Sequence, residues 1–268
     1  MNDSVLADTI TKIGAAGRDK VVVCGSHGGI YAAYLAASAG VRAVIFNDAG
    51  VGKDAAGIGG LGYCEALGLA VATVAHDSAR IGDAADMLMR GRLSHVNKQA
   101  RALGCEAGMD CRSAVALLAE SSRFSGQPPP YDEARVVIID EPGRARVVCV
   151  DSASLIRPED KGQIVITGSH GAIVGGNKTM ALQVDAFAAL FNDAGIGMDE
   201  AGVSRLPVLD ERGIAGATVA AASARIGDAR STYEDGVLSR VNMTAQALGG
   251  VAGMSARDFV AAVRSRLV

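Results

Sequence analysis

Three short polar blocks of the sequence contain side chains that can do chemistry, and each block occurs twice. They read Gly-Ser-His-Gly, Phe-Asn-Asp-Ala-Gly and Ser-Ala-Arg-Ile-Gly-Asp-Ala. Their first residues are Gly25, Phe46 and Ser78 in the first copy and Gly168, Phe191 and Ser223 in the second. The copies are 143 residues apart for the first block and 145 for the other two. A duplicated fold has to keep its apolar pattern and its turns, but it does not in general need the same polar residues. The repetition therefore predicts a working site.

Serine, histidine and aspartate together are the residue types of a hydrolase with an activated serine. The serine acts as nucleophile or oxyanion donor, the histidine acts as general base, and the aspartate orients the histidine. The residues expected in these catalytic roles are Ser26, His27, Asp48, Ser169, His170 and Asp193. Because neighbours in sequence seldom point at each other, the working pair can join Ser26 of one copy to His170 of the other.

The remaining polar residues of the blocks suit substrate binding. Arginine holds a carboxylate or a phosphate with two parallel hydrogen bonds. The residues expected to bind substrate are Asn47, Lys53, Ser78, Arg80, Asn192, Ser223 and Arg225. The sequence thus predicts a small-molecule enzyme, a metal-independent hydrolase whose substrate is a small anionic or carbonyl-containing amide, ester or ring. No metal and no cofactor are expected.

Each block also has a structural interpretation. The serine can cap a helix, Asn-Asp can form a turn, and the arginine can pair with the aspartate three residues later. All three blocks nevertheless occur together at predicted strand ends, in both copies. This joint occurrence favours the functional interpretation.

Two other functions fit the same residues. One is an isomerase or lyase that moves a proton beside a carbonyl group, and the other is a regulatory module that binds a metabolite or nucleotide. The first copy is chemically richer, because Lys53, Cys64, His76 and His95 stand where the second copy has Met198, Leu209, Ala221 and Arg240. Cys64 and His76 could form a thiolate–imidazole pair. If one copy alone is catalytic, we expect it to be the first.

The elements that position these blocks alternate between strands and helices. Short apolar, β-branched runs predict buried parallel strands at residues 20–24, 41–46 and 69–75, and at 164–167, 186–191 and 214–220. Helices are expected at residues 30–38 and 54–67, and amphipathic ones at 93–103 and 238–248. Asp110 and Ser255 are the expected caps of a last helix in each copy. Since the carboxyl ends of parallel strands share one edge of a sheet, the polar blocks should converge there.

The chain is therefore predicted to be α/β, a tandem duplication of a β-α-β-α-β-α unit with mainly parallel strands and a pseudo-twofold relation. Residues 1–120 form the first repeat and residues 152–268 the second. Residues 121–151 are a Pro-rich linker and a β-hairpin, for which we expect no counterpart at the N-terminus. Two domains and one continuous sheet are both compatible with this pattern.

Composition narrows the function further. The chain has 268 residues, 49% of them hydrophobic, and a net charge of -3 with a pI near 5.8. No basic stripe with stacking aromatics is present, so we expect no nucleic acid as partner. No apolar run reaches membrane-spanning length and no leader pattern is seen, so no membrane is expected and the protein should be cytoplasmic. The five cysteines form no C-x-x-C pair, which fits that compartment. A homo-oligomer is compatible with the sequence.

Overall fold

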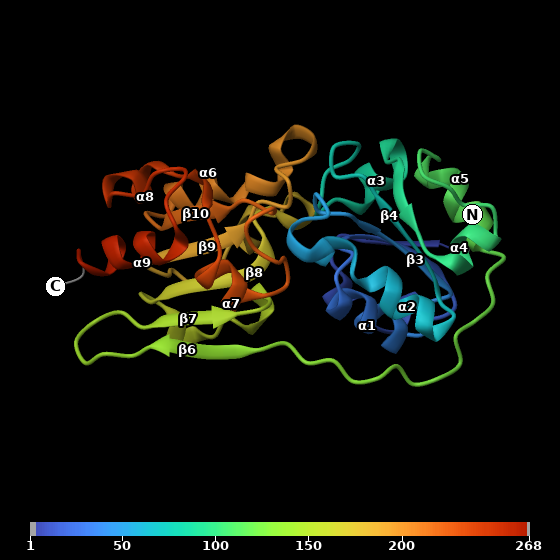
Figure 1. Ribbon diagram of the computed structural model, residues 1–268, viewed down its shortest axis with the longest axis horizontal. Coiled ribbons are helices and arrows are strands. Elements are labelled where there is room, and N and C mark those ends of the chain that lie inside the picture. The colour runs from blue at the N-terminus through green and yellow to red at the C-terminus, as the bar shows by residue number, and fades with distance from the viewer. Residues whose placement is uncertain (1–3, 267–268) are drawn as a thin grey trace.

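The computed structural model describes residues 4–266 and contains two α/β units, each built on its own sheet (Figure 1). The first sheet has the order β1-β2-β3-β4-β5. Its strands are β1 (Ser4–Ala7), β2 (Val21–His27), β3 (Ala43–Asn47), β4 (Ala70–Val74) and β5 (Leu93–Val96). All neighbours are parallel except β4 and β5, which run antiparallel.

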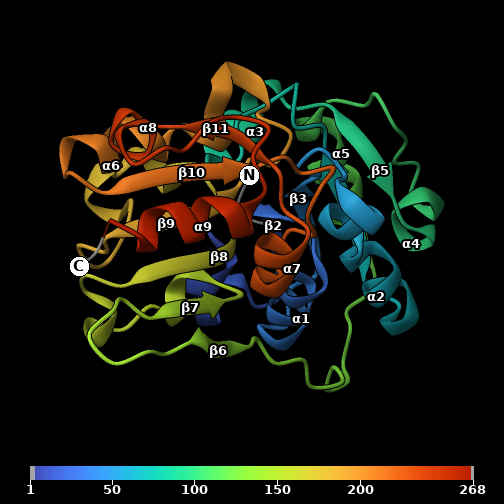
Figure 2. The ribbon, with the colours of Figure 1, turned by 60° about the vertical axis from the view of Figure 1, so that its left-hand side comes forward.

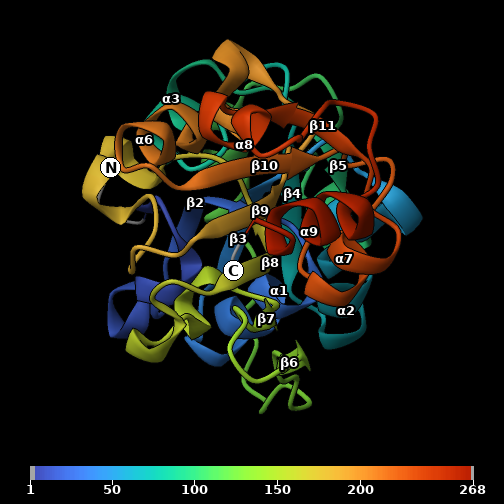
Figure 3. The ribbon, with the colours of Figure 1, turned by 90° about the vertical axis from the view of Figure 1, so that its left-hand side faces the viewer.

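The second sheet matches the first strand for strand and has one additional strand. Its order is β11-β10-β9-β8-β7-β6. The strands are β6 (Arg135–Ile139), β7 (Val147–Val150), β8 (Ile164–His170), β9 (Ala188–Asn192), β10 (Ala215–Val219) and β11 (Leu238–Val241). The run from β7 to β10 is parallel, and β11 and β6 are antiparallel edges. Figure 3 shows β10, β9, β8, β7 and β6 one below the other.

Helices cover both faces of the first sheet, because its strands are apolar on both sides. One face packs against α1 (Ile30–Ser38) and α2 (Gly60–Leu67). The other packs against α3 (Ala84–Arg90), α4 (Lys98–Ala102) and α5 (Cys111–Leu118). The predicted strands and the helix at residues 30–38 are confirmed. The expected helix at residues 54–67 is divided into a 3-10 segment, Lys53–Ile58, and α2.

The second sheet is covered in the same way, with one replacement. One face packs against α7 (Ala229–Glu234), α8 (Met243–Ala247) and α9 (Ala256–Arg264), as Figure 2 shows for α7 and α9. The other face packs against α6 (Arg205–Glu211). No helix stands in the place of α1 there: two 3-10 turns, Val174–Gly176 and Lys178–Met180, take its place. Within residues 4–266 no helix is long and apolar enough to cross a membrane.

The central hairpin is confirmed, but the expectation that it lacks a counterpart is wrong. Its strands β6 and β7 pair antiparallel, and β7 then pairs parallel with β8. The strand β1 pairs with β2 in the same way at the start of the chain. Among the strands of residues 4–266, only β6 is therefore additional. The strands form two sheets rather than one continuous sheet, and the division into residues 1–120, 121–151 and 152–268 stays a prediction.

The amphipathic helices expected at residues 93–103 and 238–248 are wrong in their first half, which forms the edge strands β5 and β11. Asn97 is the physical reason in the first unit. Its side chain accepts from the backbone N–H groups of Ala100 and Val71 and donates to the carbonyl of Leu69. It thus caps α4 and ties the chain to the start of β4, so that the helix cannot extend further back. Asn242 makes the matching bonds in the second unit. The expected caps Asp110 and Ser255 are confirmed.

The two units meet where the loops after β3 and β9 cross. A methyl group built on Gly50 would lie 2.9 Å from the Cα atom of Gly195, and both glycines have positive φ. Hydrogen bonds across the crossing come in matched pairs: the N–H of Lys53 donates to the carbonyl of Ala221, and that of Met198 to the carbonyl of His76. Matched ion pairs follow further out, Arg80 with Asp199 and Arg225 with Asp54.

The crossing predicts that Gly50→Ala is destabilising. The new methyl group would meet the backbone of the other unit, and Gly50 has a φ of 73°. We expect the free energy of unfolding to fall by about 1–3 kcal/mol in urea titration. Gly62→Ala in α2 is the control, because nothing lies within 4 Å of its added methyl group. That variant should be neutral or more stable by about 0.5–1 kcal/mol. Equal stability of both variants would contradict the close crossing.

Candidate functional site

The two Gly-Ser-His-Gly blocks lie at the carboxyl ends of parallel strands, as predicted. The serine and histidine are the last residues of β2 and β8 rather than part of a turn. Pairing with the neighbouring strand is irregular there, between Val23 and His27 and between Ile166 and His170. This irregularity redirects the last residues of each strand at the edge where the units face each other.

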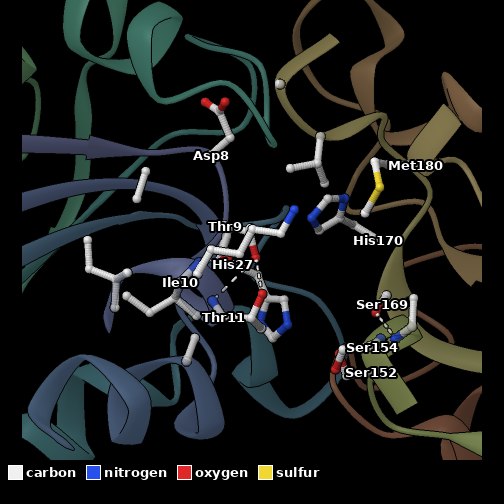
Figure 4. Close-up of a pocket in the computed structure, with 18 of the residues that line it drawn as sticks. Asp8, Thr9, Ile10, Thr11, His27, Ser152, Ser154, Ser169, His170 and Met180 are labelled. Carbon is white, nitrogen blue, oxygen red and sulfur yellow. Dashed lines mark hydrogen bonds between the residues drawn. The ribbon is translucent and has the colours of Figure 1, made fainter. Parts of the chain in front are cut away.

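A cavity of about 540 Å³ lies between the units at these strand ends. Residues of both units line it, among them Ser26, His27, Glu133, Ser169, His170 and Arg205. Figure 4 shows His27 and His170 extending into the same space from the two units. The structure thus brings together the four serine and histidine residues expected to be catalytic.

Both serine hydroxyls accept a backbone hydrogen bond from the loop that follows the neighbouring strand. The Oγ atom of Ser26 accepts from the N–H of Ile10 at 3.0 Å, and that of Ser169 from the N–H of Ala153 at 2.9 Å. Neither serine caps a helix: α1 begins after Gly29 and has no side-chain cap. Each hydroxyl keeps its own proton, which it can donate to a group in the cavity.

Both histidines are neutral and share one tautomer. The Nδ1 atom of His27 accepts from the N–H of Gly29, and that of His170 from the N–H of Ala172, each at 3.2 Å. An accepting Nδ1 leaves the proton on Nε2. Burial lowers the pKa of His27 to about 4. Burial lowers the pKa of His170 well below its usual range, and the positive charge of Arg205 and the repulsion that a protonated His27 would add lower it further.

The two aspartates do not orient these histidines. The Oδ1 atom of Asp48 accepts from the backbone N–H groups of Gly50 and His76, and lies 3.0 Å from Nδ1 of His76. Asp193 accepts from two backbone N–H groups in the matching place. Both carboxylates therefore hold the crossing loops, and the expected Ser/His/Asp arrangement is not formed within residues 4–266.

The residues expected to bind substrate have structural partners instead. Asn47 donates to the carbonyl of Ala79 and accepts from Ala49, while Ser78 donates to the carbonyl of Ala75. Asn192 and Ser223 make the matching bonds in the second unit.

The three expected cations form ion pairs across the units. Arg80 pairs with Asp199, Arg225 with Asp54, and Lys53 with Asp235 at 2.9 Å. Within the described chain none of the three cations lines the cavity.

The alternative thiolate–imidazole pair of Cys64 and His76 is not formed among the described residues. Cys64 lies on the buried face of α2, in the apolar core between α1 and the sheet, and burial raises the pKa of its thiol to about 12. His76 instead contacts Asp48. In residues 4–266, no three His, Cys, Asp or Glu side chains converge to hold a metal ion.

Arg205 and Glu133 are among the cavity residues that the sequence does not predict. Arg205 is buried and stands where the first copy has Gly60, so a difference between the copies was the available signal. Glu133 comes from the end of the connector, where no pattern marks it. Burial and the charge of Asp151 raise the pKa of Glu133 to about 7, although hydrogen bonds from Tyr31 and Ser152 lower it.

The pair of His76 and Asp48 predicts a pH-dependent contribution to stability. The hydrogen bond to Asp48 raises the pKa of His76, although burial lowers it; burial raises the pKa of Asp48, but the bonds from His76 and Gly50 prevail and lower it. Because folding raises the pKa of His76, its protonation stabilises the folded state below the usual value of 6.5, and this stabilisation is lost as pH rises. Because folding lowers the pKa of Asp48, its ionisation stabilises the folded state above the usual value of 3.8, and this stabilisation is lost as pH falls. The pair should therefore stabilise most between these two values.

We expect His76→Ala to lower the free energy of unfolding by about 1–2 kcal/mol near pH 5.5 and by less at pH 9, measured by urea unfolding. His76→Gln can keep a neutral hydrogen bond to Asp48. It should therefore remove only the pH dependence of the stability. A loss in His76→Ala that is constant from pH 5 to pH 9 would refute the charged pair.

No family model, no curated protein and no solved structure matches this chain. Its function therefore has to be inferred from its own contacts and chemistry.

Proposed function

We propose that this chain is an enzyme that binds a small anionic or carbonyl-containing molecule in the cavity between its units and catalyses proton transfer on it. One observation carries the proposal: a single cavity gathers the serine and histidine from the strand ends of both units together with Glu133. Such a concave site, on which polar groups of both units converge, is typical of small-molecule sites.

The titratable groups in the cavity support acid–base catalysis. A general acid or base works best when its pKa lies near the working pH. Glu133, with a pKa of about 7, is present in both protonation states at neutral pH. His27 and His170 are neutral and carry a proton on Nε2, so they can donate to a developing negative charge without being cations.

The same geometry favours proton transfer over a serine nucleophile. A nucleophilic serine needs a base that takes its proton. Within residues 4–266 neither Ser26 nor Ser169 has a hydrogen bond to a histidine, and Asp48 is engaged by His76. The two hydroxyls instead suit a role as hydrogen-bond donors to a carbonyl or enolate oxygen of the substrate. The hydrolase predicted from sequence would then use a water molecule activated by Glu133, and it remains the second candidate.

The state of the cysteines is the basis for proposing a cellular compartment. All five are free and buried. Proteins of reducing compartments commonly keep their thiols in this form. We therefore propose a cytoplasmic enzyme, and a homo-oligomer stays a prediction.

Glu133→Gln should lower proton exchange about 100-fold or more, because the amide can neither take nor give a proton. The assay is deuterium uptake from D₂O into small oxo and hydroxy acids, followed by NMR, across pH 5–9. The pH profile of the exchange rate should also lose, in this variant, the change near pH 7 that titration of Glu133 produces. Glu141→Gln in the exposed hairpin turn is the control. An unchanged rate and profile in Glu133→Gln would refute the proposal.

Ser26→Ala and Ser169→Ala separate the candidate reactions. Loss of a hydrogen-bond donor to the substrate oxygen should lower turnover roughly 10²- to 10³-fold, with no covalent intermediate detectable by mass spectrometry. Loss of a nucleophile would remove roughly 10⁶-fold, and an acyl-enzyme would be seen in the parent protein. That second outcome would establish the serine hydrolase. Ligand binding without turnover in the parent protein would instead identify a regulatory module.

A further inference from the structure

Arg205 is the most deeply buried cation that faces the cavity. Its residue is 5% exposed, it is the first residue of α6, and it lines the cavity beside His170. Removing a guanidinium from water is costly unless an anion or a full set of hydrogen bonds compensates for it. Its partners therefore decide whether the residue is structural or awaits a ligand.

The partners of Arg205 are neutral. Its Nε atom donates to the carbonyl of Ala172 at 2.9 Å, its Nη1 atom donates to the carbonyl of Ala181, and the guanidinium lies 4.9 Å from the ring centre of Phe191. In residues 4–266 no carboxylate forms an ion pair with it, and its Nη2 atom has no hydrogen bond. Arg135 is a contrast within the same chain, because its mostly buried guanidinium holds Asp160 with two bonds.

We propose that Arg205 binds the carboxylate of the substrate. The inference rests on the proposed function only in placing the substrate in this cavity. The Nη2 edge supplies a charged donor, and the Nε2 proton of His170 can supply a neutral one. One guanidinium with neutral donors balances one negative charge, which fits a monocarboxylate better than a phosphate dianion.

The other charged side chains that line the cavity are Lys12, Asp8, Asp151 and Glu133, and the raised pKa of Glu133 lets it be neutral near pH 7. Lys12 is exposed and forms no ion pair with residues 4–266, so it adds a positive field at the rim. Asp8 and Asp151 also line the cavity, but their Oδ1 atoms accept from the N–H groups of Ala84 and Ala229 at the start of α3 and α7. These two carboxylates thus have structural partners that hold them at the helix ends.

The first unit cannot provide an equivalent arginine. Gly60 takes the matching position, and both backbones make the same bond: the N–H of Gly60 donates to Gly28, and that of Arg205 to Gly171. A side chain at Gly60 would meet Ala33 of α1, whose Cβ atom lies 2.7 Å from the added carbon. The carboxylate site therefore exists only in the second unit, and the substrate is held in one orientation.

Binding of pyruvate, measured by calorimetry and by the rise in melting temperature, tests the proposal without requiring turnover. We expect Arg205→Met to lose the binding and Arg205→Lys to weaken it at least ~10-fold, because lysine cannot reproduce a planar contact. Arg212→Met is the matched control. Arg212 ends the same helix region and binds the carbonyls of Leu182 and Val184 and the carboxylate of Asp185, but it does not line the cavity.

Several results would overturn this assignment. The first is that the parent protein does not bind pyruvate, the second is that Arg205→Met binds it unchanged, and the third is that inorganic phosphate binds more tightly than pyruvate. If Arg205→Met does not fold, an unchanged dissociation constant in Arg205→Lys would overturn it equally. Failure of proton exchange with intact, Arg205-dependent binding would thus refute the enzyme and leave the carboxylate site standing.

Discussion

The backbone crossing of two glycine loops is the constraint on which the rest of the molecule depends. Gly50 and Gly195 approach so closely that neither position has room for a side chain, and both have a positive φ that favours glycine. The crossing sets the strand ends of one sheet opposite those of the other. A single sheet of this kind offers a ligand one crevice at its carboxyl edge. Here two such edges enclose one cavity, with Ser26 and His27 on one side and their counterparts on the other.

The crossing also explains why polar residues recur in both copies. Where two similar units face each other, a contact made by one can be matched by the same contact made by the other, and both sides then need the same residues at those places. Asp48, Arg80 and their counterparts meet this requirement, because they hold the loops or bridge the units. Repetition of a polar motif thus follows from an interface as readily as from catalysis. The Ser-His pairs differ from the other two blocks in facing the cavity.

Periodicity and turn residues were enough to predict most of the frame. The parallel strands, α1, the hairpin and the last helix of each unit follow from local patterns that depend on few neighbours. The edge strands β5 and β11 were missed because Asn97 and Asn242 act through bonds to distant backbone groups. The site was harder still. The pKa of Glu133 depends on its burial, on the charge of Asp151 and on a hydrogen bond with Tyr31, and no local pattern reports contacts between residues so far apart.

The differences between the two units bear more directly on the proposed substrate than their similarities do. In the first unit α1 fills the space beside Gly60, whereas in the second unit two short turns replace that helix and leave room for Arg205. Arg205 in turn donates a hydrogen bond to the carbonyl of Ala181, in the segment that replaces the helix. The absence of the helix leaves room for the arginine, and the arginine holds the replacing segment in place. A symmetric frame would bind a substrate in either of two orientations. Under the proposed function, one cation on one side would remove that ambiguity, and a molecule with one anionic end would present its other end to Glu133 and the two histidines in the same way each time.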